Sequence, residues 1–95
     1  MGQELVVQGA ITGPESRTLV PLVIDNIGED VKRVVVDLKE CDLLTSDLIA
    51  NLRQLRKALE SRQIPVVLTQ VGGINKQICE RLGMSRLFAI EIAQD

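Results

Sequence analysis

The chain has 95 residues, of which 45% are hydrophobic and 25% charged, with a formal net charge of −2, and these values are typical of one folded domain over 1–95 rather than a disordered or fibrous chain. Acidic and basic residues are interspersed, and Phe88 is the only aromatic residue. The sequence therefore lacks the basic runs and stacking aromatic side chains that nucleic-acid binders use, and we expect no nucleic-acid partner.

The first predicted elements are a strand and a helix. The β-branched, apolar run ELVVQGAI at 4–11 predicts a strand. TGPE at 12–15 has Glu three residues after Thr, a capping box that starts a helix, and apolar spacing extends this helix over 13–28. Pro21 lies inside it, where its ring and missing N–H predict either a kink or a regular part that starts later, near Thr18.

The middle of the chain predicts two strands with an amphipathic helix between them. RVVVDL at 33–38 is a continuous apolar run, typical of a strand covered on both faces in a parallel sheet. The next helix, over 46–62, carries one apolar stripe, formed by Leu48, Ile49, Leu52, Leu55 and Leu59. IPVVLT at 64–69 predicts a strand with Pro65 at its beginning, where a ladder donor can be spared.

The last third predicts a helix over 73–82 and a final strand, LFAIEI, over 87–92. The apolar face of this helix is expected to carry Ile74, Ile78 and Leu82. The element order is then βαβαβαβ, which predicts an α/β fold with a mainly parallel four-stranded sheet packed with helices, because crossovers between parallel strands are right-handed. The residues expected to be buried in its core include Val35, Leu52, Leu55 and Val67.

The residue types present exclude most catalytic chemistry. Histidine is absent, so no Ser-His-Asp or Cys-His arrangement can form, and two scattered cysteines, Cys41 and Cys79, cannot supply a zinc site. We therefore expect no enzyme activity, no metal and no cofactor. Because both cysteines stand beside apolar residues, we expect them to be small buried hydrophobes rather than a disulfide.

No apolar stretch approaches the roughly 20 residues that a membrane span requires, and the N-terminal sequence MGQELVVQGA has no basic region or long apolar region typical of a signal peptide. We therefore expect a cytoplasmic protein without direct membrane insertion. Whether the chain forms a homo-oligomer stays open.

The turn in DLLTSDLIANL, residues 42–52, is the candidate functional site. In open α/β sheets functional groups collect at the carboxyl ends of strands, and Ser46 follows the strand 33–38 at the N-terminus of the next helix. Free N–H groups and the helix dipole favour an anion there, so Ser46 could accept a phosphate. The alternative is that Ser46 only caps the helix.

Two other segments have simpler interpretations. QVGGINK at 70–76 lacks the spacing of a P-loop, so we interpret it as a strand-to-helix turn. Four basic residues on the helix 46–62 are typical of a solvated helix face, with docking of a partner as the alternative; they are Arg53, Arg56, Lys57 and Arg62.

Several features of residues 34–90 occur together: a Val-rich strand ending in Asp-Leu, a loop leading to a turn that holds Ser46 and Asp47, an amphipathic helix, a further strand and a late LG helix end followed by LF. With these features the segment resembles the STAS family, the anti-sigma factor antagonists of bacteria. In that family the phosphoacceptor lies nine residues after the Asp of the Asp-Leu ending. Counting from Asp37, the resemblance implies Ser46 as the phosphoacceptor.

The resemblance also implies a partner. The family precedent is a serine-kinase anti-sigma factor or a stressosome component, whose binding phosphorylation disrupts; the partner-binding residues would be Leu44, Thr45, Asp47, Leu48 and Asn51. Most members have Asp just before the acceptor and often Gly two positions after it, whereas this chain has Thr45 and Leu48, as in stressosome-type members without the Gly. Alternatives are an accessory subunit of a membrane transport complex, docked without phosphorylation, and a nucleotide sensor.

Overall fold

Four parallel strands form one sheet, and their order across the sheet is their order in the chain. The computed structural model describes residues 4–9 and 13–94. The strands are β1 (Glu4–Val7), β2 (Arg33–Asp37), β3 (Val66–Val71) and β4 (Ala89–Ile92). The helices are α1 (Leu19–Asn26), α2 (Ser46–Glu60) and α3 (Ile74–Leu82), with short 3-10 helices at Gly13–Thr18 and Met84–Arg86. The predicted α/β class and parallel four-stranded sheet are confirmed.

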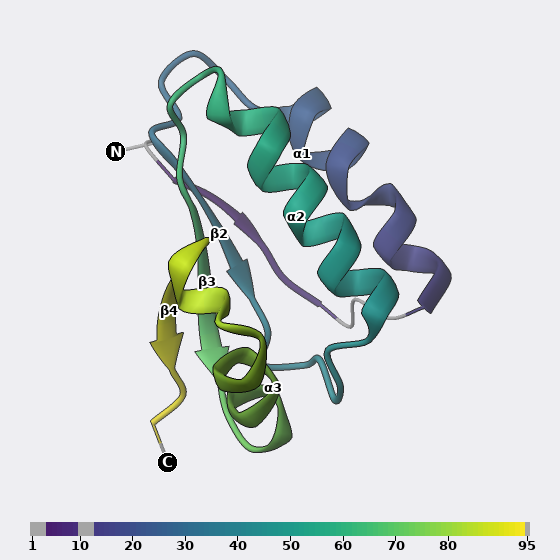
Figure 1. Ribbon diagram of the computed structural model, residues 1–95. Coiled ribbons are helices and arrows are strands. Elements are labelled where there is room, and N and C mark those ends of the chain that lie inside the picture. Colours follow the sequence, from purple (N-terminus) through teal and green to yellow (C-terminus); the bar gives the residue numbers. More distant parts are fainter. Residues whose placement is uncertain (1–3, 10–12, 95) are drawn as a thin grey trace.

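The strand order decides where the helices lie. When parallel neighbours follow one another in chain order, right-handed crossovers place the connecting helices over the same face of the sheet. Figure 1 shows α1 and α2 side by side over the sheet, with α3 at the end of the sheet where the chain leaves β2. The loop before α2 and the first turn of α3 therefore lie at the same end of the molecule (Figure 1).

The core forms between the sheet and these helices. The predicted apolar stripe of α2 is confirmed, since Leu48, Ile49, Leu52, Leu55 and Leu59 are all buried. Val34 and Val36 of β2 belong to the same cluster, and alternation along the strand turns Val35 to the opposite face. All four residues predicted to be buried are buried: Val35, Leu52, Leu55 and Val67.

The N-terminal helical segment differs from a single helix over 13–28. It begins as a 3-10 helix, and the α-helix starts at Leu19, so the later start near Thr18 is confirmed. Pro21 then falls in the first turn of α1, where a backbone N–H has no intrahelical partner to lose. The Thr of the predicted capping box and the end of the first predicted strand lie at residues 10–12, outside the described residues.

The orientation of α3 is the main error in the predicted fold. Ile74 and Leu82 are 50% and 49% exposed, so the predicted apolar face is wrong at both ends, although Ile78 packs against the core. The residues that α3 buries are Asn75 and Cys79, which are one helical turn apart. The rotation has a physical cause, because the Asn75 side chain makes two hydrogen bonds to the loop before α2.

Other boundaries shift by a few residues. β3 begins just after Pro65 and continues to Val71, whereas the prediction was 64–69. β4 begins at Ala89 because Met84–Arg86 forms a 3-10 helix first. No helix within 4–9 and 13–94 has the length and apolar character needed to cross a bilayer.

Candidate functional site

The turn before α2 places Ser46 at the surface as the first residue of the helix. Its neighbour Thr45 is the N-cap, with an extended backbone, and the Thr45 hydroxyl accepts a hydrogen bond from the Leu48 N–H at 3.2 Å. The interpretation of Ser46 as the cap is therefore wrong. Since Thr45 performs this role, the exposed Ser46 hydroxyl is not needed to cap α2.

The electrostatic surroundings of Ser46 combine a helix N-terminus with exposed carboxylates. The first backbone N–H groups of α2 and the positive end of its dipole stabilise negative charge at this position. Asp47 lies in the same first turn, and Glu40 and Asp42 are exposed on the preceding loop. A phosphate on Ser46 would thus be tolerated by the helix while adding to an already acidic surface.

The residues predicted to bind a partner divide into two groups. Thr45 and Asp47 are half-buried and exposed, respectively, whereas Leu44 and Leu48 are only 3% and 0% exposed. The side chains of these two leucines pack in the core, so they present little apolar surface to a partner. The Asn51 amide is half-buried and donates to the Asp47 carbonyl at 2.8 Å and to the Ser16 hydroxyl at 3.3 Å.

Two residues near the turn were not predicted from the sequence. Leu43 is 47% exposed; one of two adjacent leucines in a surface loop had to face outward, but the sequence does not say which. Asn75 accepts a hydrogen bond from the Leu44 N–H at 2.8 Å and donates to the Cys41 carbonyl at 2.9 Å. The local sequence does not predict these hydrogen bonds, since the residues that Asn75 contacts lie more than 30 residues earlier in the chain.

The capping arrangement gives a direct prediction. Thr45→Ala should lower the free energy of unfolding by about 1 kcal/mol, because the Leu48 N–H loses its acceptor. Ser46→Ala should change it by less than about 0.5 kcal/mol, as expected for an exposed site. Urea denaturation of the two variants and the wild type measures both values. An equal decrease in the free energy of unfolding for Ser46→Ala would indicate that Ser46 also caps the helix and would contradict this prediction.

Both cysteines are free and buried, which confirms their predicted structural role. Burial raises the pKa of the Cys41 and Cys79 thiols, with Asp42 and Glu80 adding smaller increases. For Cys41, a backbone hydrogen bond of Leu43 acts in the opposite direction and lowers the pKa in part.

A pH dependence of stability follows from these thiols. Thiols in the unfolded chain have an ordinary pKa of about 8.5, whereas the buried thiols of the folded chain have a higher pKa. Above about pH 8.5 the unfolded chain therefore loses its thiol protons first, and the free energy of unfolding falls as the pH rises. The free energy of unfolding should therefore fall between pH 8 and pH 10. The control, Cys41→Ala with Cys79→Ala, should show a smaller fall over the same range in urea denaturation. Equal slopes for both proteins would contradict the assignment.

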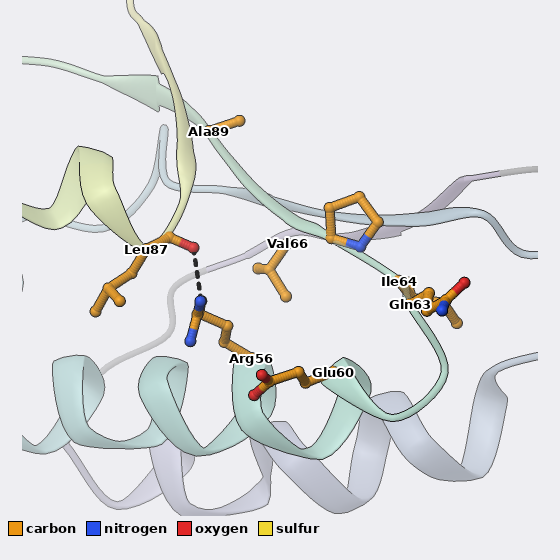
Figure 2. Close-up of a pocket in the computed structure, with 8 residues that line it drawn as sticks. Arg56, Glu60, Gln63, Ile64, Val66, Leu87 and Ala89 are labelled. Atoms are coloured by element: carbon orange, nitrogen blue, oxygen red, sulfur yellow. Dashed lines mark hydrogen bonds between the residues drawn. The ribbon is translucent and has the colours of Figure 1, made fainter.

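A second candidate site lies at the opposite end of α2 from Ser46, beside the start of β4. This cavity of about 300 Å³ is open, and Figure 2 shows Arg56 reaching across it. The Arg56 Nε donates to the Leu87 carbonyl at 2.8 Å (Figure 2), so Arg56 is half-buried, unlike the exposed Arg53 and Lys57. The cavity is lined by Arg56, Glu60, Gln63, Ile64, Pro65, Val66, Leu87 and Ala89.

The other predicted features have ordinary structural roles. Residues 72–73 connect β3 directly to α3, which confirms that QVGGINK is a strand-to-helix turn. Gly73 has φ +57°, a backbone conformation that favours glycine. Within the ranges that the structure describes, no three histidine, cysteine or acidic side chains gather where they could hold a metal ion.

Comparison with known proteins identifies the fold family. No curated protein matches the sequence. The structure is similar to the crystal structure of a sulfate transporter family protein from Wolinella succinogenes, with a TM-score of 0.75 and 15% sequence identity over 97% of this chain and 79% of that one. The family model described as the STAS domain matches residues 4–95, and the chain therefore belongs to the STAS domain family.

Proposed function

We propose that the chain is a regulatory protein-binding module of the cytoplasm, an anti-sigma factor antagonist that binds a serine-kinase anti-sigma factor or a stressosome component. In this proposal the turn at Ser46 is the docking site, and phosphorylation of Ser46 switches binding off. The observation that carries the proposal is that Ser46 is exposed at the N-terminus of α2 while Thr45 caps the helix. The hydroxyl can therefore be modified without removal of the cap.

The composition of the turn supports a switch of this direction. A phosphate adds about −1.5 to −2 charges where Glu40, Asp42 and Asp47 already expose carboxylates. A partner that fits the unmodified turn would have to desolvate this added charge and bring it into contact, which weakens docking. The exposed Leu43 side chain supplies an apolar contact beside the acceptor.

The second candidate is an accessory subunit of a membrane transport complex that docks constitutively through the same turn. Two observations favour it. The similar crystal structure is of a sulfate transporter family protein, and Thr45 stands where most STAS phosphoacceptors are preceded by Asp. In this case Ser46 would be a small contact residue and would carry no phosphate.

The two functions are separated by an affinity-capture experiment in extract from the source cells, with added ATP. Wild type and Ser46→Ala serve as baits, and Ser46→Asp imitates part of the phosphate charge. The antagonist function predicts capture of a serine kinase by Ser46→Ala, release of the wild type from the kinase once ATP has placed a phosphate on Ser46, and no capture by Ser46→Asp. Capture of transporter subunits by wild type, without phosphate on Ser46, would favour the second candidate and contradict the first.

A further inference from the structure

The loop between β2 and α2 is held in place from a distant part of the chain. Its first residues are fixed by the sheet and by a local turn, through hydrogen bonds from the Leu38 N–H to the Thr69 carbonyl and from the Cys41 N–H to the Leu38 carbonyl, both at 3.0 Å. The last part, which leads into Thr45, is attached to the Asn75 side chain.

The Asn75 carboxamide uses both of its functional groups for this attachment. Its oxygen accepts from the Leu44 N–H at 2.8 Å, and its nitrogen donates to the Cys41 carbonyl at 2.9 Å. Asn75 is 4% exposed. Without these bonds a buried N–H and a buried C=O would lose their partners, which is unfavourable in the protein interior.

The attachment to Asn75 affects the candidate site because of the position of Leu44. Leu44 directly precedes the cap residue Thr45 and the exposed Ser46. A displacement of its backbone would therefore move the cap and the acceptor together. The hydrogen bonds bridge 31 and 34 residues, so they tie this turn to the first turn of α3 rather than to its own helix.

We propose that Asn75 is a positioning residue for the Ser46 turn, which holds the acceptor in a fixed geometry by fastening residues 41–44 to α3. The consequence for partner binding rests on the function proposed above, whereas the placement of the turn does not. The two are therefore tested by separate measurements.

The first measurement is amide hydrogen exchange by NMR. Asn75→Leu removes both hydrogen bonds and keeps a side chain of similar size, and the control, Gln77→Leu, makes the same chemical change at an exposed position of α3. Exchange of the Leu44 amide should rise by about tenfold in Asn75→Leu, relative to the Leu68 amide of the central strand β3 as a reference for global opening. It should be unchanged in the control. Equal Leu44 protection in both variants would overturn the proposal.

The second measurement reports on the turn itself without a biological partner. In a Ser46→Cys background, the introduced thiol lies at a helix N-terminus, which lowers its pKa. Its reaction with a small aromatic disulfide reagent is followed against pH, and the unsubstituted protein measures the background from the buried cysteines. Adding Asn75→Leu should move the midpoint upward by roughly half a pH unit, because the turn is less firmly held. A profile that matches the one with Gln77→Leu would contradict positioning of Ser46.

A third measurement addresses binding to the kinase captured as described above. Asn75→Leu, still folded, should lower its affinity by roughly fivefold or more, within the range of couplings between distinct sites, and Gln77→Leu should not. Unchanged affinity would overturn the coupling to recognition. If wild-type binding does not respond to Ser46 at all, the proposed function fails, and the exchange and thiol measurements still decide whether Asn75 positions the turn.

Discussion

Leu52→Ala should lower the free energy of unfolding by about 2–5 kcal/mol, the usual range for a leucine removed from a packed core. Leu52 is 0% exposed and lies at the centre of the buried stripe of α2. Its neighbours on that stripe, Leu48 and Leu55, are also fully buried, so the structure has little freedom to collapse into the space left behind. Urea denaturation measures the loss.

The matched control is Leu82→Ala, which makes the same truncation on α3 where the leucine is 49% exposed. Because the half-exposed Leu82 side chain buries less apolar surface on folding, the decrease in the free energy of unfolding should be well below that of Leu52→Ala, on the order of 0.5 kcal/mol. A loss under about 1 kcal/mol for Leu52→Ala would contradict the assigned buried face, since a core leucine costs more than this to truncate.

The second large effect is expected at Ser46, the proposed phosphoacceptor. Ser46→Asp should weaken binding to the physiological partner by at least about tenfold, because it adds a charge beside Asp47 in the proposed contact surface. Ser46→Ala should bind as wild type does, since it adds no charge and keeps the side chain at this position small. Isothermal titration calorimetry with the purified partner compares the three proteins.

The fold of the aspartate variant should remain intact, which allows the lost binding to be assigned to the interface. A negative charge in the first turn of α2 interacts favourably with the helix dipole, by about 0.3–1 kcal/mol. Thermal unfolding should therefore show no loss of stability. Ser85→Asp adds the same charge at an exposed position outside the turn and should leave affinity unchanged. Equal weakening by both variants would indicate a general charge effect instead.

The sequence predicted the elements whose signals are local and repeated. The stripe of α2 recurs over four turns, and the β2 strand contains three consecutive valines, so both elements and their buried residues were predicted, with ends within two residues of the observed ones. The start of α1 was limited to two alternatives by Pro21, because the ring of proline fixes where a regular helix can begin.

Features that depend on contacts between distant residues could not be predicted. The α3 face follows from hydrogen bonds of Asn75 to a loop more than 30 residues away, and a pattern of apolar spacing contains no trace of them. The cap of α2 was missed for a different reason, since only Ser46 was considered for that role. Thr45 and Ser46 are adjacent and both suit an N-cap, and only the extended backbone at Thr45 decides between them.

Phosphosite mapping by mass spectrometry is the most direct test of Ser46 as a switch. The protein is incubated with the captured kinase and ATP, beside Ser46→Ala under the same conditions. The proposed function predicts one phosphate on Ser46 in the wild type and none in the variant. Equal labelling of the two proteins, or a phosphate on Thr45 with Ser46 unmodified, would contradict it.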